Sequence, residues 1–193
     1  MFAYKIHHYL LVLLICTFDL KSHELRPVPW LTEEAIVFLE NFCRNNANAK
    51  ILEFGCGAST IWLSKKTTNL VSIEHNEEWY NFIINALHKN VDCKKVDLKL
   101  LPRPYGRICE IFPDYYFDLI LIDGRDRVTC TKCSIKKLKK GGVLMLDNSE
   151  RAWYRPIYHL LQEWQYYETE QSQPDMCGFW YKNWKTSWWI KPY

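Results

Sequence analysis

The sequence predicts an α/β fold: a doubly wound sheet of seven mostly parallel strands, with helices on both faces and an antiparallel hairpin at the C-terminal edge. Short apolar runs alternate with segments of helical periodicity, a pattern typical of right-handed crossovers between parallel strands. A Gly-x-Gly turn follows the first apolar run, and acidic residues follow several others. In such a sheet, ligands bind beyond the carboxyl ends of the strands.

The N-terminal half contains three strands and three helices in alternation. Thr32 is expected to cap a helix because Glu33 and Glu34 would complement its dipole and apolar residues then recur at helical spacing. Asn76 is expected to cap another helix whose apolar face runs from 79 to 87. The remaining predicted elements are strands over 50–54 and 70–74, a helix from about 59, and a strand within 91–101.

The C-terminal half continues the alternation. The run Phe-Asp-Leu-Ile-Leu-Ile over 117–122 predicts a central parallel strand over 117–123 that is covered on both faces. A second strand of this kind is predicted over 142–146, with helices near 129–139 and 152–163. The segments 167–169 and 186–190 are expected to form the terminal hairpin.

Length and composition fit one domain over 23–193, because a chain of 193 residues with 48% hydrophobic content can bury a full core. The formal charge of +3 is mild, so no nucleic-acid partner is expected. Residues 1–22 contain a ten-residue apolar run that suits either a signal peptide or an extra helix. Such a helix would pack on the domain or contact a membrane surface peripherally.

The chain contains eight cysteines, several of them within predicted strands or helices. A free cysteine at such a position acts as a small apolar residue, so a reducing compartment is expected. Cys130 and Cys133 have the spacing of a redox or metal pair, but no second pair at zinc-finger spacing accompanies them. Two packed thiols and a cytoplasmic location are therefore expected, with membrane association or a signal-like N-terminus as the alternative.

The turn after the first strand predicts a cofactor cradle. Gly55 and Gly57 let the backbone approach a ligand closely, and the helix behind offers unpaired N–H groups. A dinucleotide-binding turn would need a third glycine where this chain has Thr60. Glu53 before the turn suits a ligand with positive charge, such as the sulfonium and ammonium groups of S-adenosylmethionine, better than it suits NAD.

Four segments in the right order resemble a known family. Ile51-Leu52-Glu53-Phe54-Gly55-Cys56-Gly57, Ser72-Ile73-Glu74-His75, Leu121-Ile122-Asp123-Gly124 and Lys139-Lys140-Gly141-Gly142-Val143-Leu144 are similar to the ordered motifs of class I S-adenosylmethionine-dependent methyltransferases. The resemblance covers roughly residues 29 to 192 and implies a Rossmann-like fold with S-adenosylmethionine as cofactor.

Glu74 is the predicted ribose ligand. It lies at the tip of the second strand, where a carboxylate can accept hydrogen bonds from both ribose hydroxyls of an adenosyl group. The resemblance implies the same role, places His75 beside the adenosine, and assigns Glu53 to the ammonium group directly or through water. The predicted cofactor-binding residues are Glu53, Gly55, Cys56, Gly57, Ser59, Glu74, His75 and Asp123.

Asp123, Asp147 and Asn148 follow neighbouring strands and suit a hard cation such as Mg²⁺, which would lower the pKa of an acceptor hydroxyl. They resemble the metal triad of catechol-type O-methyltransferases. That family places a lysine three residues after the first aspartate, where this chain has Asp126. The alternative is that Asp123 is a turn residue and that Asp147-Asn148 caps a helix. The predicted catalytic residues are Asp123, Asp126 and Asp147, and the predicted metal ligands are Asp123, Asp147 and Asn148.

The predicted function is methyl transfer to a small-molecule acceptor, at oxygen. Segment 102–116 and a lid over 174–184, both rich in aromatic residues, are expected to wall the acceptor pocket. Two alternatives stay open: aminopropyl transfer from the decarboxylated cofactor on the same fold, and a non-catalytic cofactor-binding interaction module.

Overall fold

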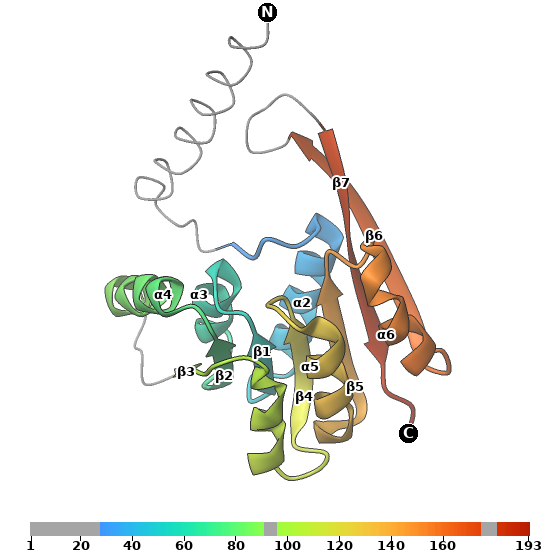
Figure 1. Cartoon of the computed structure of the whole chain (residues 1–193), viewed down its shortest axis with the longest axis horizontal. Helices are drawn as coiled ribbons and strands as arrows, with labels where there is room; N and C mark the ends of the chain where they lie inside the picture. Colours follow the sequence, from blue (N-terminus) through green and yellow to red (C-terminus); the bar gives the residue numbers. More distant parts are fainter. Residues whose placement is uncertain (1–27, 91–95, 175–180) are drawn as a thin grey trace, which may run out of the picture.

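The computed structural model describes residues 28–90, 96–174 and 181–193 (Figure 1). Strands and helices alternate through most of this part of the chain. The elements are α2 (Glu33–Asn45), β1 (Lys50–Phe54), α3 (Ala58–Ser64), β2 (Asn69–Glu74), α4 (Glu77–Asn90), β3 (Val96–Leu100), the 3₁₀ helix η3 (Tyr105–Ile111), β4 (Phe117–Ile122), α5 (Arg127–Ser134), η4 (Ile135–Lys137), β5 (Leu138–Asp147), η5 (Ala152–Tyr154), α6 (Arg155–Leu160), β6 (Gln165–Pro174) and β7 (Tyr181–Ile190).

The seven strands form one sheet in the order β3-β2-β1-β4-β5-β7-β6, which confirms the predicted fold class. The first five strands in this order are parallel to one another, and β7 is antiparallel to both β5 and β6. The chain order reverses between β1 and β4, which lie side by side. A doubly wound sheet binds its ligand at this switch point.

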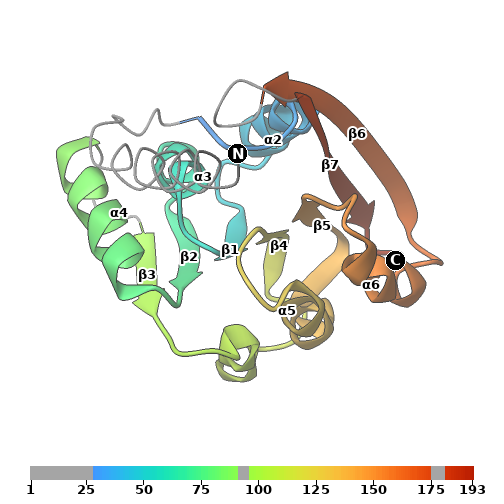
Figure 2. The ribbon, with the colours of Figure 1, turned by 45° about the horizontal axis from the view of Figure 1, so that its top comes forward.

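Alternate residues of β4 face the two halves of the core. Leu119 and Leu121 pack with α2 and α3, and Ile120 and Ile122 pack with η3, α5 and α6. Figure 2 shows α2, α3 and α4 on one face of the sheet and α5 and α6 on the other. Because the central strands are covered on both faces, they are continuous apolar runs, as the sequence indicated.

Two elements differ from the prediction. The helix expected over 129–139 begins earlier, at Arg127, and ends in η4, so that Lys139 and Lys140 belong to β5. The helix expected over 152–163 is divided into η5 and the short α6. Lys139 of β5 forms an ion pair with Asp118 of the neighbouring β4, at 2.7 Å. Local helix or strand propensity does not predict such a contact between distant residues.

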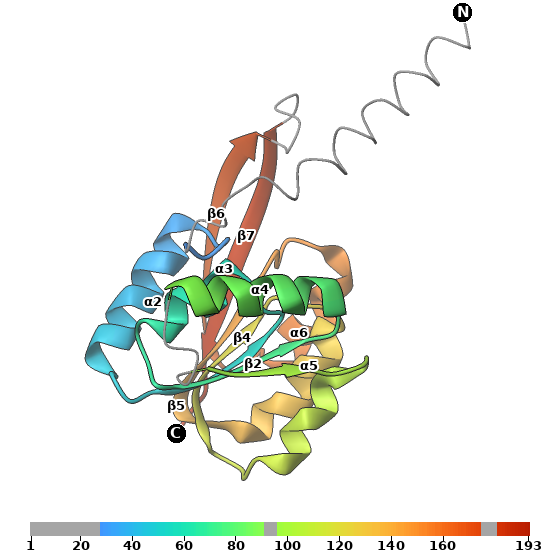
Figure 3. The same cartoon turned by 90° about the vertical axis from the view of Figure 1, so that its left-hand side faces the viewer.

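The terminal hairpin is much longer than predicted. β6 and β7 pair from Gln165 opposite Ile190 to Pro174 opposite Tyr181, and they project beyond the rest of the sheet (Figure 3). Residues 181–184 therefore belong to a strand, and the predicted lid is wrong for them. The remainder of that prediction, over 175–180, lies outside the described residues.

The predictions for residues 1–22 also lie outside the described residues. No helix within the described ranges is both long enough and apolar enough to cross a bilayer.

Candidate functional site

A cleft of about 440 Å³ opens at the carboxyl ends of β1, β2 and β4. Its volume lies within the roughly 300–1,000 Å³ that small-molecule sites occupy. It is lined by Trp30, Gly55, Cys56, Gly57, Ala58, Ser59, Glu74, His75, Asn76, Trp79, Asp123, Gly124, Arg125, Arg127, Asn148 and Arg151. The cleft thus gathers seven of the eight predicted cofactor-binding residues, the exception being Glu53.

The two glycines of the β1 turn have different surroundings. Gly55 has φ +96°, and a Cβ there would lie 2.6 Å from the Gly124 backbone, so the β1 and β4 turns touch. At Gly57 a Cβ would meet no atom within 4 Å. The space in front of Gly57 is therefore open, as a cradle for a bound ligand requires.

Glu53 is fully buried and supports the cradle from behind. Its carboxylate accepts hydrogen bonds from the hydroxyls of Ser59, Thr60 (2.6 Å) and Ser72 (2.5 Å). Burial raises its pKa to about 7, although the three hydroxyls act in the opposite direction. Glu53 is absent from the cleft wall, and Ser59, which it holds, lines the cleft instead. Its predicted contact with a ligand ammonium group, directly or through water, stays a prediction.

Glu74 ends β2 with its carboxylate at the cleft wall. One oxygen, Oε1, accepts the backbone N–H groups of His75 (2.7 Å) and Asn76 (2.8 Å) and lies 2.8 Å from His75 Nδ1. These contacts fix the carboxylate through a single oxygen. A side chain held in this way can offer its other oxygen to a diol.

Two aromatic side chains hold the neighbouring turns. Trp79 of α4 donates from Nε1 to the carbonyl of Cys56 at 2.6 Å, and its own N–H is capped by Asn76 Oδ1 at 2.8 Å. Tyr105 of η3 donates its hydroxyl to the carbonyl of Arg125 at 2.6 Å. Both residues fix backbone at the cleft, which makes it rigid on two sides.

Arg127 dominates the β4 side of the cleft. It is nearly buried, and its guanidinium donates to Asp123 Oδ1 (3.0 Å), the Asp123 carbonyl (2.7 Å) and the Gly124 carbonyl (2.9 Å). It also donates to the carbonyl of Asp147 and, at 3.5 Å, to Asn148 Oδ1. A guanidinium has five N–H donors and no acceptor, so a surrounding set of oxygen atoms suits it. Nη2 has two N–H groups and shares them among the two Asp123 oxygens and Asn148 Oδ1.

The predicted magnesium ligands do not fit a divalent cation. Arg127 donates to Asp123 Oδ1 and, at 3.5 Å, to Asn148 Oδ1, so its positive charge lies beside two of the three side chains that a cation would need. Its contact with Asp147 is to the backbone carbonyl. Asp147 is buried, is absent from the cleft wall, and accepts a hydrogen bond from Thr186 of β7 at 3.0 Å. Within the described ranges, no group of three or more His, Cys, Asp or Glu side chains is placed to hold a metal.

The two aspartates titrate as neighbours. Burial raises the pKa of Asp147 well above its usual value, and the charge of Asp123 raises it further. Burial also raises the pKa of Asp123, while Arg127 acts in the opposite direction. Because Arg127 forms its ion pair with Asp123, its positive charge favours ionisation of Asp123 over ionisation of Asp147.

Asp126, predicted as catalytic, faces elsewhere. It forms a bidentate ion pair with Arg103, and this partner lowers its pKa. It is absent from the cleft wall. A carboxylate held by an arginine outside the cleft is a poor general base, so the assignment of Asp126 is not supported.

Segment 102–116, the predicted acceptor wall, does not line the cofactor cleft. Tyr105 and Cys109 of η3 pack in the core against β1 and β4, and none of the described cleft-lining residues comes from this segment. Sequence reasoning missed Arg127 and Trp79 as site residues. The Arg-Asp-Arg run at 125–127, directly after the fourth strand, was the available signal for Arg127.

No protein-family model matches the chain, and comparison with curated protein sequences finds no match either. Solved structures do match. An O-methyltransferase from Bacillus cereus in complex with SAH is 19% identical, with a TM-score of 0.64 over 85% of this chain and 84% of that one. A precorrin-6y C5,15-methyltransferase from Geobacter metallireducens is 17% identical, with a TM-score of 0.60 over 88% and 90%. An SAM-dependent O-methyltransferase from Thermotoga maritima is 15% identical, with a TM-score of 0.59 over 83% and 66%. The chain therefore shares the fold of these methyltransferases.

Proposed function

We propose that this protein is an S-adenosylmethionine-dependent methyltransferase that methylates a small molecule at an oxygen atom. The observation that carries the proposal is the Glu74 carboxylate, held through one oxygen at the tip of β2 and facing a cleft with open space at Gly57. The shared fold with solved methyltransferases, one of them in complex with SAH, supports the same cofactor.

Each end of the cofactor has a matching set of residues. Glu74 would accept the ribose hydroxyls, and His75 would lie beside the adenosine. The backbone at Gly55, Cys56 and Gly57 would receive the methionine portion, where the absence of a side chain at Gly57 leaves room. Glu53 is a positioning residue because it holds Ser59 and Thr60 at the start of α3.

The bound cofactor would supply an activated methyl group on its sulfonium. The protein then needs chiefly to align an acceptor with that methyl group and to exclude water, since positioning accounts for a large part of such rate enhancements. Trp79 and Tyr105 serve this purpose by fixing the backbone of the turns on either side of the cleft.

Asp123 is the residue best placed to receive the acceptor's proton. Among the described residues that line the cleft, Glu74 and Asp123 are the two carboxylates, and Glu74 belongs to the ribose end. The side chain of Asp123 is 25% exposed and is oriented by Arg127. A carboxylate that can accept a hydroxyl proton favours an oxygen acceptor, and two of the structurally similar proteins are O-methyltransferases.

The proposal is tested by calorimetric titration of the full chain with S-adenosylmethionine and with its demethylated product, followed by transfer of a labelled methyl group to candidate hydroxyl compounds. We expect micromolar binding of both and an alkali-stable methyl ether as product. A folded protein that binds neither compound contradicts the proposal. Binding of the product without transfer to any hydroxyl compound contradicts its catalytic part.

A further inference from the structure

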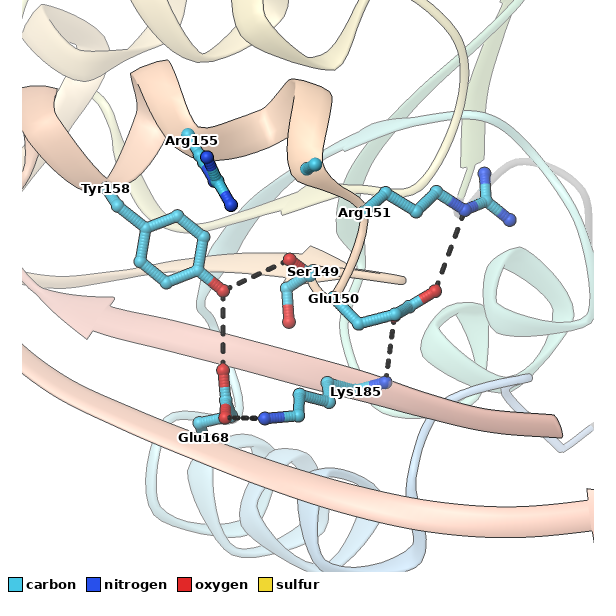
Figure 4. Close-up of a pocket in the computed structure, with 8 residues that line it drawn as sticks. Ser149, Glu150, Arg151, Arg155, Tyr158, Glu168 and Lys185 are labelled. Carbon is cyan, nitrogen blue, oxygen red and sulfur yellow. Dashed lines mark hydrogen bonds and ion pairs between the residues drawn. The ribbon is translucent and has the colours of Figure 1, made fainter.

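A second cavity of about 330 Å³ lies beside the cofactor cleft (Figure 4). It is formed by the segment that follows β5 together with α6 and the two strands of the hairpin. Arg151 lines both cavities, and the residues just before it divide between them: Asn148 lines the cleft and Ser149 lines the second cavity. A molecule bound in the second cavity would therefore extend toward the cleft along this segment.

The carboxylates that line this cavity already have hydrogen-bond and ion-pair partners within the protein. Glu168 of β6 forms an ion pair with Lys185 Nζ at 2.5 Å and accepts a hydrogen bond from Tyr166 at 2.6 Å. Glu150 accepts the backbone N–H of Lys185 at 3.0 Å and lies 3.7 Å from Arg151 Nε. The charges of Lys185 and Glu168 thus neutralise each other, and neither needs a ligand to balance its charge.

The arginines of this segment are not neutralised in the same way. Arg155 is exposed and makes no ion pair with any described acidic residue, and Figure 4 shows its guanidinium pointing into the space beside Tyr158. Arg151 pairs with Glu150 at 3.7 Å, a longer contact than the 2.5 Å pair of Lys185 and Glu168. Arg125, which lines the cleft, is likewise exposed and has no acidic partner among the described residues. Among the described charged residues that line the second cavity, the one without an ion-pair partner is therefore the cation Arg155.

Exposed aromatic surface accompanies these arginines. Trp30 at the cleft and Trp153 next to Arg151 are each 66% exposed. The Arg151 guanidinium lies 5.9 Å from the ring of Trp153. Two large exposed indoles near one binding region suit a ligand with a flat or apolar body, because aromatic faces gain most from such contacts.

We propose that the methyl acceptor is an anionic small molecule whose carboxylate or phosphate group binds Arg151 and Arg155 in the second cavity, while its apolar body extends into the cofactor cleft. Arginine is suited to both anions because its planar fork donates two parallel hydrogen bonds. The identification of the bound anion as the methyl acceptor rests on the proposed function. The anion site itself can be tested separately.

The test uses matched probes on the full chain, each titrated with and without the demethylated cofactor. The probes are 4-hydroxybenzoate, its uncharged carboxamide and 4-hydroxyphenyl phosphate, so the carboxylate and phosphate sources are compared directly. We expect at least one anion to bind at least about tenfold more tightly than the carboxamide, since hydrogen bonds to a charged group are stronger than those to a neutral one. Binding should weaken as salt concentration rises.

Variants locate the site. Arg155→Gln and Arg151→Gln should each weaken anion binding about fivefold or more and leave the carboxamide unchanged, a loss typical of one charged hydrogen bond. Arg107→Gln, an exposed arginine of η3 outside both cavities, is the matched control. Equal binding of anion and carboxamide, no binding of either anion, or equal loss in the control overturns the proposal. Anion binding at Arg151 and Arg155 in a protein that does not bind the cofactor would uphold the anion site and contradict the proposed function.

Discussion

The guanidinium of Arg127 donates to the carboxylate of Asp123 at 3.0 Å, and the same group contacts the carbonyl of Asp147 and the side chain of Asn148. An internal cation therefore lies among the three residues that the sequence indicated as ligands of Mg²⁺. The carboxylate of Asp123 is oriented by the guanidinium of Arg127, a side chain of the same polypeptide. This orientation requires no metal ion.

Arg127→Ala should strongly destabilise the protein, by about 3–5 kcal/mol, because it leaves the Asp123 charge without its partner in a partly buried site. Thermal and urea unfolding measure the loss. Arg125→Ala, an exposed arginine of the same turn, is the control and should unfold as the unaltered protein does. Equal stability of the two variants would show that the Arg127 network contributes little.

Removal of divalent cations should leave the protein unchanged. The side-chain oxygens of Asp123 and Asn148 already receive hydrogen bonds from Arg127, and the Asp147 carboxylate receives one from Thr186. A chelator such as EDTA should therefore alter neither the affinity of the protein for the demethylated cofactor nor the melting temperature of the protein. Calorimetry and thermal unfolding with chelator, and again with added Mg²⁺, provide the measurement. A Mg²⁺-dependent rise in melting temperature would contradict the assignment of this position to Arg127.

Glu74→Ala should reduce affinity for the demethylated cofactor about 100-fold or more, since two hydrogen bonds to a charged carboxylate are worth about 1.5–3 kcal/mol each. Calorimetry measures the change. Glu78→Ala removes an exposed carboxylate of α4 and should bind as the unaltered protein does. Unchanged affinity in a folded Glu74→Ala protein would remove Glu74 from the site.

Alanine substitution should affect stability at one glycine of the β1 turn and cofactor binding at the other. Gly55→Ala should destabilise the fold, because its Cβ would meet Gly124 at 2.6 Å and φ is +96°. Gly57→Ala should fold normally, because its Cβ meets nothing within 4 Å, yet it should weaken cofactor binding by filling the cradle. Unfolding and calorimetry on both variants separate the effects. Full cofactor affinity in Gly57→Ala would place the ligand elsewhere.

Glu53 should make stability depend on pH. Its pKa is raised from 4.5 to about 7 in the folded protein, so the folded state binds more protons than the unfolded state between these values. Its contribution to stability is therefore complete below about pH 4.5 and is lost as pH rises to about 7, a change of about 3 kcal/mol. Urea unfolding at pH 5 and pH 8 measures it.

The control for that experiment is a pair of neutral variants. Glu53→Gln should lose this part of the pH dependence, because the amide has no charge to desolvate. Glu110→Gln changes an exposed residue and should keep the dependence. If Glu53→Gln shows the same pH profile as the unaltered protein, burial of Glu53 does not govern stability in this range.

Much of the fold could be predicted from local patterns. The strands β1, β2 and β4 begin and end within a residue or so of their predicted bounds, because each is an apolar run bounded by a glycine, an acidic residue or a cap. The start of β5 and the length of the hairpin could not be predicted from local patterns, because they depend on pairing partners that are distant in the sequence. Lys139 pairs with Asp118, and Gln165 lies opposite Ile190.

The candidate site divides in the same way. Glu74 and Gly57 are at the cleft as predicted, because the end of a parallel strand fixes where its next residues emerge. Glu53 lies one residue before the end of β1 and Asp147 ends β5, yet both side chains are turned into the protein by hydroxyl partners from other elements. A strand end places a backbone at the edge of the sheet, but it does not set the direction of a carboxylate.

The sequence by itself determined the order of strands and helices, the turn of the cradle and the position of Glu74, because these follow from periodicity and from residues adjacent in the chain. Only the tertiary structure decided that Arg127 would lie among Asp123, Asp147 and Asn148 and that Asp126 would pair with Arg103. The physical reason is that burial and geometry decide which of the residues brought together by the fold a long charged side chain pairs with. Spacing along the chain does not predict this pairing.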